Sequence, residues 1–118
     1  MAGYCHCTRC QRRTGAAAAP SAAVLTTAFR LTDGEEHVRR WNAGDGNDKA
    51  FCETCGSALF SQNPDEPGFT FVRMGSFDVD PGVRPRFRAH VSSAAAWEPV
   101  PDDGTIHFAG PIERAKLV

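Results

Sequence analysis

The sequence lacks the features that would place the protein in a membrane, on nucleic acid or outside the cell. No apolar run approaches the ~20 residues that a membrane-spanning helix needs. Thirteen Lys and Arg against fourteen Asp and Glu leave a net charge of −1, without the basic excess typical of nucleic-acid or anionic-membrane binders. Residues 1–5 carry neither a charged nor an apolar segment typical of a signal peptide. We therefore expect a cytoplasmic protein that works without a membrane or nucleic acid.

The chain also lacks internal repeats, linkers and long helical patterns. Its 118 residues, 42% hydrophobic and 23% charged, suit one domain over 1–118 with a modest core. Residues 8–14 are the one segment that favours a helical turn. The remaining pattern is of short apolar or alternating segments between Gly, Pro, Asn and Asp turns, at 22–31, 37–41, 58–61, 69–74 and 86–91. This pattern predicts a mainly β domain.

Cysteine is the residue that the chain has in excess. Five cysteines form two groups, the C-x-C-x-x-C of Cys5, Cys7 and Cys10 and the C-x-x-C of Cys52 and Cys55. An odd number cannot be fully paired in disulfides, and a thioredoxin-like dithiol would need a βαβ context that the chain lacks. Thiolates are soft ligands, and a C-x-x-C turn brings two sulfurs to one ion, so the spacing predicts Zn²⁺ binding.

Spacing alone allows two arrangements of the metal. Cys7, Cys10, Cys52 and Cys55 can close a single four-thiolate site, which would be purely structural. Alternatively Cys5, Cys7 and Cys10 form a three-thiolate site, whose open fourth position is what a catalytic zinc requires. The first arrangement is the commoner one in small zinc domains.

The residues around these cysteines resemble a known family. Residues 5–15, 51–60 and 75–78, followed by His90-Val91 and Trp97, are similar in order to the motifs of the glutathione-dependent formaldehyde-activating enzymes, a family that also contains centromere protein V. The resemblance implies a β-tent fold, with small antiparallel sheets around zinc. It also implies that Cys5, Cys7 and Cys10 hold a catalytic zinc, while Cys52 and Cys55 supply half of a structural four-cysteine site.

The chain departs from the family pattern at its beginning. The other half of the structural site is normally a C-x-C in an earlier strand, and this sequence starts almost at Cys5. We therefore expect an N-terminally short domain, with Cys52 and Cys55 lacking their usual partners and a sheet edge exposed.

The resemblance implies a zinc-dependent carbon–sulfur lyase that acts on thiol adducts of small aldehydes, as in S-hydroxymethylglutathione formation. The expected partners are a small thiol such as glutathione and an aldehyde such as formaldehyde, and a homodimer is compatible with this interpretation. The alternative is a non-enzymatic, zinc-stabilised β-module that binds a partner.

Arginine and histidine side chains are the candidates for substrate contacts. Eleven arginines against two lysines favour bidentate contacts with carboxylates. The candidate anchors for an anionic substrate are Arg12, Arg13, Arg86 and Arg88. His90 is a candidate general base or a buried hydrogen-bonded residue, and His6 is expected to pack behind the ligands rather than bind the metal. Trp41 and Trp97 are expected in the core.

Overall fold

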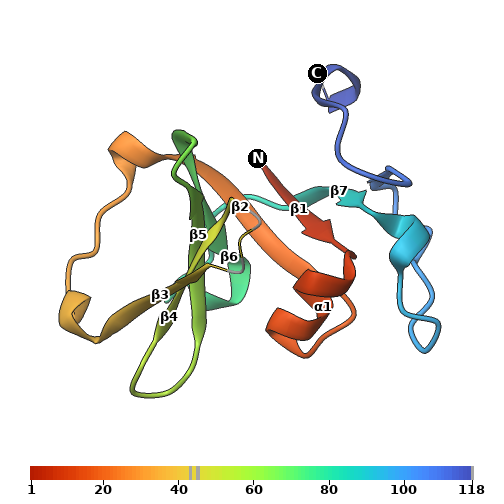
Figure 1. The fold of residues 1–118 in the computed structure, drawn as a ribbon. Coiled ribbons are helices and arrows are strands. Elements are labelled where there is room, and N and C mark those ends of the chain that lie inside the picture. The colour runs from red at the N-terminus through yellow and green to blue at the C-terminus, as the bar shows by residue number, and fades with distance from the viewer. Residues whose placement is uncertain (43, 45, 118) are drawn as a thin grey trace. The chain divides into compact units, whose positions relative to one another are not determined.

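A computed structural model describes residues 1–42, 44 and 46–117. The chain divides into two compact units, a first unit of residues 1–20 and 82–118 and a second unit of residues 21–81. The regular secondary structure of the chain is mainly strand, so the mainly β prediction is confirmed (Figure 1). The strands and the α-helix are β1 (Ala2–Cys5), α1 (Thr8–Thr14), β2 (Ala19–Leu25), β3 (Val38–Asn42), β4 (Asp48–Cys52), β5 (Ala58–Asn63), β6 (Glu66–Arg73), β7 (Pro85–Ala89) and β8 (Ile106–His107). Short 3-10 turns lie at Thr26–Ala28, Glu35–His37, Met74–Ser76, Val91–Ser93 and Arg114–Leu117.

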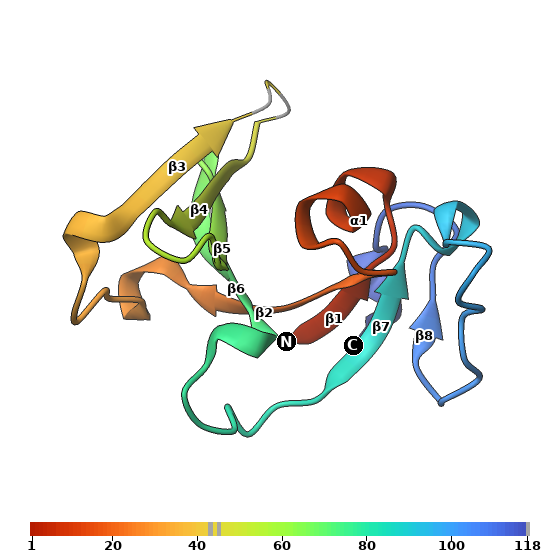
Figure 2. The same cartoon turned by 90° about the horizontal axis from the view of Figure 1, so that it is seen from below.

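The strands of the first unit run parallel. β1 pairs with β7, and β7 pairs with β8 on its other side (Figure 2). Gly3 lies opposite Phe87 in this pairing, and a Cβ atom at Gly3 would collide with the Phe87 ring. The ring packs edge-on against Phe108, with ring centroids 6.4 Å apart. The missing side chain of Gly3 therefore lets an aromatic pair cover β1.

Small residues fill the buried positions of the first unit. They are Ala2, Ala17, Ala19 and Ala89, together with Phe108 and Leu117. Because small side chains allow close approach of the backbone, β1 and the segment after α1 can pack tightly. This packing positions the loop that carries the first three cysteines.

The second unit is an antiparallel sheet with the order β3-β4-β5-β6-β2. Phe60, Ala50 and Val72 form its buried centre, and Phe29 packs on Phe60 with ring centroids 4.8 Å apart. Thr70 is fully buried, and its hydroxyl lies 3.0 Å from that of Thr26. The alternation of such residues with polar ones is the period-2 pattern expected of a half-buried sheet.

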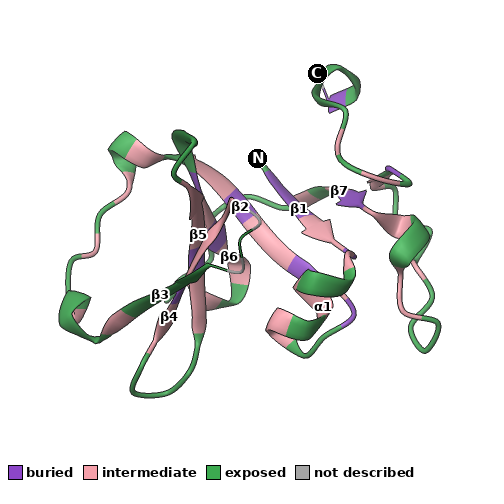
Figure 3. Ribbon diagram, viewed as in Figure 1, coloured by how far each residue is buried: buried purple, intermediate pink, exposed green. Residues whose placement is uncertain are grey.

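The structure confirms the helical segment at 8–14, and a strand overlaps each of the other segments that the sequence pattern indicated. It adds β1, β4 and β8, which the pattern did not reveal. The expectation that both tryptophans are buried is wrong. Trp41 is 53% exposed on β3, most of which is exposed in Figure 3, and Trp97 is 70% exposed. The buried hydrophobic residues are mostly alanines, together with phenylalanines such as Phe60 and Phe108, and neither tryptophan is among them.

Candidate metal centre

Three thiols of the first unit gather where β1 meets α1. Cys5 is the last residue of β1, Cys7 caps the N-terminus of α1, and Cys10 lies in its first turn. Their Sγ atoms all lie within 4.8 Å of one another, and all three residues are half-buried. Among residues 1–42, 44 and 46–117, no other group of three Cys, His, Asp or Glu side chains comes together in this way.

Hydrogen bonds from Gln11 and a glycine cap fix the shape of this loop. The Gln11 N–H donates to the carbonyl of Cys7 at 3.0 Å, which starts the helix. The Gln11 side-chain amide donates to the carbonyls of His6 at 2.7 Å and Ser93 at 2.9 Å. Gly15 ends the helix in the left-handed conformation with φ of 67° that glycine adopts readily. The loop is thus held at both ends before any ligand binds.

Hydrogen bonds connect the three cysteines of the loop. The Cys10 backbone N–H donates to the Cys7 Sγ at 3.4 Å. A hydrogen bond from the Cys10 side chain lowers the pKa of Cys5, while burial acts in the opposite direction. Since thiolate is the form that binds metal, the lowered pKa prepares Cys5 for coordination.

The donor set fits a soft divalent ion. Sulfurs around a tetrahedral zinc lie about 3.8 Å apart when each Zn–S bond is about 2.3 Å. The three Sγ atoms, within 4.8 Å of one another, need only small rotations to reach that spacing. Three ligands from one short loop also leave a fourth position for an external ligand.

The second cysteine pair forms a tight turn in the second unit. The Gly56 N–H donates to the Cys52 carbonyl at 2.7 Å, and Gly56 has a φ of 76°. The Cys52 N–H donates to the Ser57 carbonyl at 2.9 Å, which closes the turn. Cys55 is exposed, and a hydrogen bond from the Ser57 hydroxyl, 3.1 Å away, lowers the pKa of its thiol. The tight turn and the lowered pKa of Cys55 are compatible with a half-site for metal.

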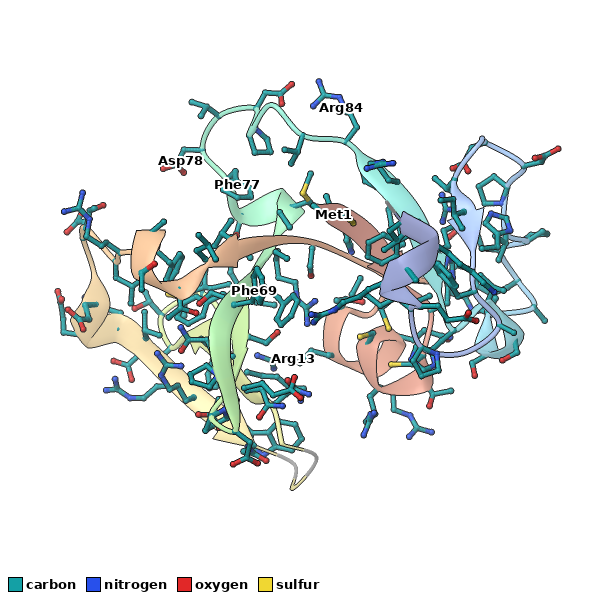
Figure 4. The ribbon with its side chains drawn as sticks, turned by 90° about the horizontal axis from the view of Figure 1, so that it is seen from above. Met1, Arg13, Phe69, Phe77, Asp78 and Arg84 are labelled. Carbon is teal, nitrogen blue, oxygen red and sulfur yellow. The ribbon has the colours of Figure 1, made fainter. Side chains whose placement is uncertain are left out.

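The candidate anchors of substrate occupy different environments. Arg12 and Arg13 lie in the last turn of α1, Arg12 exposed and Arg13 half-buried. Arg86 is exposed, and the register shift between β1 and β7 leaves it opposite no β1 residue. The neighbouring Arg84 points outward from the segment before β7 (Figure 4). The arginines of β7 therefore do not form one exposed strip, because Arg88 is buried.

His90 follows β7 directly and takes an unusual backbone conformation. Its φ of 57° is the one positive value among the described residues other than glycine. The His90 N–H donates to the Gly110 carbonyl at 2.8 Å, and its own carbonyl accepts from the Ser93 N–H at 3.0 Å. His90 thus turns the chain into the segment Val91–Ser93, where the Ser93 carbonyl accepts a hydrogen bond from Gln11. The residue before it, Ala89, is the register partner of Cys5.

A polar cluster around the buried side chains of His6 and Arg88 lies beside the cysteine loop. The Arg88 guanidinium donates to Nε2 of His6 at 3.2 Å and to the Asp103 carboxylate at 2.9 Å, and it lies 4.1 Å from the Tyr4 ring centroid. Burial, with the charge of Arg88, lowers the pKa of His6, although the Ala17 backbone raises it. Hydrogen bonds from Thr105 and Arg88 hold the pKa of Asp103 far below its usual range. His6 is buried, its Nε2 atom lies at Arg88, and it is not one of the three clustered ligand residues.

Sequence reasoning missed Tyr4 and Asp103 as partners of this cluster. Asp103 lies in a Pro-Asp-Asp-Gly segment that reads as an ordinary turn, and its partner Arg88 is fifteen residues away. Only the pairing of β1, β7 and β8 brings them together. In the sequence, the one sign of this cluster was the series of arginines at alternate positions, Arg84, Arg86 and Arg88.

Comparison with known proteins identifies the family of the chain. The family model of the glutathione-dependent formaldehyde-activating enzyme matches residues 1–93. The chain therefore belongs to that family. A comparison with curated proteins gives no match. Among solved structures, the crystal structure of a Rhodobacter sphaeroides protein is similar, with 29% sequence identity, a TM-score of 0.56 and 72% of each chain covered.

None of the helices in the described part of the chain has the length and apolar character to cross a membrane.

Proposed function

We propose that this chain is a zinc-dependent enzyme that adds a small thiol, such as glutathione, to formaldehyde or a similar aldehyde, and catalyses the reverse cleavage. The observation that carries the proposal is the cluster of Cys5, Cys7 and Cys10, whose three sulfurs lie within 4.8 Å of one another. Three ligands would leave the fourth position of a tetrahedral ion open to substrate. Membership of the formaldehyde-activating family supports the substrate class. We also propose that residues 1–118 act as one functional domain.

The reaction needs no oxidant or reductant. The sulfur of the thiol forms a bond to the aldehyde carbon, the π bond of the carbonyl breaks, and the thiol proton ends on the new hydroxyl. The reverse reaction breaks the same carbon–sulfur bond, which makes the enzyme a carbon–sulfur lyase. Zinc on the three cysteines would lower the pKa of a thiol or polarise an oxygen.

The residues of the chain have separate roles in this proposal. The three cysteines hold the metal, and Gln11 keeps their loop in shape through its bonds to the His6 and Ser93 carbonyls. His90 follows the residue that pairs with Cys5, which makes it the candidate to carry the proton between sulfur and oxygen. The candidate anchors for substrate carboxylates are Arg12, Arg13, Arg86 and Arg88.

Cys52 and Cys55 are proposed to bind a second, structural metal. Their turn resembles half of a closed thiolate site, and ligands from elsewhere would complete it. The competing arrangement, in which Cys7, Cys10, Cys52 and Cys55 share one ion, would leave no open position and no catalytic role for the metal.

The test combines metal analysis with kinetics. The zinc-loaded protein should accelerate the exchange between formaldehyde, glutathione and their adduct, measured by magnetisation-transfer NMR. Cys7→Ser should abolish this acceleration, whereas Cys55→Ser should preserve it in protein that remains folded. A zinc edge spectrum showing one ion bound by four sulfurs, lost in either variant, would refute the catalytic proposal and support the binding module.

A further inference from the structure

The C-x-x-C turn of the second unit supplies two ligands, which is half of what a structural zinc needs. Cys52 ends β4, and Cys55 lies in the turn that follows. A hydrogen bond joins their side chains, so the two sulfurs lie together, as two ligands of one ion must. In the part of the chain that the structure describes, neither cysteine belongs to a group of three possible ligands. A structural metal here therefore needs two ligands from beyond this turn.

The histidine and the carboxylates beside the turn are engaged with other groups. His37 is a neighbour of the turn, because its carbonyl accepts from the Glu53 N–H at 2.8 Å. The Glu53 carboxylate lies 2.8 Å from the Arg39 guanidinium through Oε2 and 3.7 Å from Nδ1 of His37 through Oε1. Nε2 of His37 lies 3.5 Å from the Glu36 carboxylate. These side chains thus pair with one another and do not complete the cysteine pair.

The turn is exposed and has a fixed shape. Residues 53–57 are all exposed, and Cys52 is half-buried. The bonds from the Gly56 N–H to the Cys52 carbonyl at 2.7 Å and from the Cys52 N–H to the Ser57 carbonyl at 2.9 Å hold the backbone. A Cβ atom at Gly56 would meet nothing within 4 Å, so the turn borders open space. Both sulfurs can therefore meet ligands from another molecule without refolding of the turn.

The charges of the turn allow a second copy of it to approach. Glu53 is the one charged residue among 53–57, and the Arg39 guanidinium balances it. Two such turns therefore meet with little repulsion between like charges. Two C-x-x-C pairs supply four thiolates, which is the donor set of a closed structural zinc site. A second copy of the chain carries the missing pair in the geometry that the first copy already has.

We propose that two copies of this chain share one zinc ion, which is bound by Cys52 and Cys55 of both copies. The two turns are related by a two-fold axis through the ion, so that each surface contacts its own equivalent. The shared site has four sulfurs and no position for substrate, and its role is to hold two chains together. The inference rests on the proposed function, in which this pair binds a structural metal, and it names the partner that completes the site.

The test measures the mass and the zinc content of the full, zinc-loaded chain. Sedimentation equilibrium is run at several protein concentrations, with a phosphine reductant present so that no disulfide links two chains. We expect dimers with about 1.5 zinc ions per chain, because each three-cysteine cluster binds one ion and each chain owns half of the shared ion.

Cys55→Ser is the decisive variant, because Cys55 is exposed and its replacement should leave the fold intact. It should give monomers with about one ion per chain. Thr54→Ala changes an exposed residue of the same turn without removing a ligand, so this matched control should remain dimeric. Cys7→Ser should also remain dimeric and retain about half an ion per chain, whose X-ray absorption spectrum should show four sulfur ligands.

Three results would overturn the proposal. Monomers of the zinc-loaded parent would show that the two turns do not share an ion, and that any metal on the pair is completed by other ligands, such as a small thiol. Dimers that persist in Cys55→Ser would place the contact between the chains elsewhere. Loss of one and the same ion in both Cys55→Ser and Cys7→Ser would show that the two groups of cysteines bind it jointly.

The same samples can be assayed for exchange between glutathione and formaldehyde. Zinc-linked dimers without catalysis would refute the proposed catalytic role alone. Catalysis by a parent chain that remains monomeric would refute the shared ion alone.

Discussion

The close approach of Gly3 to the Phe87 ring predicts that a larger side chain at position 3 lowers the stability of the protein. A Cβ atom at position 3 would overlap the Phe87 ring, and the ring cannot retreat without disturbing its edge-on contact with Phe108, at a centroid distance of 6.4 Å. Overpacking of this kind typically costs about 1–3 kcal/mol. Disturbing an aromatic pair costs about 0.5–1.5 kcal/mol. Gly3→Ala should therefore reduce the free energy of unfolding by about 2–4 kcal/mol.

Urea unfolding followed by circular dichroism measures this change. Gly68→Ala is the matched control, since Gly68 lies in β6 and a Cβ there would meet nothing within 4 Å. It should be neutral or slightly stabilising, because alanine restricts the unfolded chain. In a Phe87→Leu background the cost of Gly3→Ala should fall by more than half. A cost of Gly3→Ala that is equal in both backgrounds would show that the ring contact is not its cause.

Three further predictions concern the polar cluster, the turn after β7 and the metal. Asp103→Asn should destabilise the protein at neutral pH. Because the pKa of Asp103 is lowered in the fold, the difference in unfolding free energy between the variant and the parent should shrink as pH falls below about 4. A difference that grows in acid would contradict this. His90→Asn should keep the melting temperature of the parent, because asparagine tolerates a positive φ. His90→Val should lower the melting temperature, because a β-branched residue does not tolerate it. Equal decreases of melting temperature in both variants would argue against backbone strain as the cause. Cys7→Ser should lower zinc content by about one ion per chain, as measured by mass spectrometry, whereas the exposed Ser92→Ala should not.

The spacing of the cysteines left two groupings open, and the resemblance to the family selected the group of Cys5, Cys7 and Cys10. The spacing of Cys5, Cys7 and Cys10 fits one helical turn entered from a strand, and the structure places the three sulfurs together. Gln11 and Gly15 belong to the same local pattern, because a cap and a side chain within five residues of the ligands need no tertiary information. The fold class was also evident, since short segments between turn residues have few alternatives to a sheet.

Parallel strand pairing was not predictable in the same way. β1 and β7 are separated by eighty residues, and β1 has only four residues, Ala2–Cys5, with two of them small. Their register carries a shift between Ala2 and Gly3, which leaves Arg86 opposite no β1 residue. A simple alternation of arginines could not reveal that shift. Nor could it show that Arg86 is exposed and Arg88 is buried.

The register of β1 on β7 also explains why binding groups of different chemistry lie so close in the chain. Cys5 pairs with Ala89, whose small side chain leaves space beside the thiol, and Tyr4 pairs with Arg88, whose guanidinium covers the ring. A slip of one residue would exchange the two faces of the strand, turning the thiols to the side on which Tyr4 and His6 now lie. Gly3 opposes such a slip, because a Cβ atom opposite Phe87 would collide with its ring. A glycine that binds nothing is therefore expected to keep the strand that carries Cys5 in register.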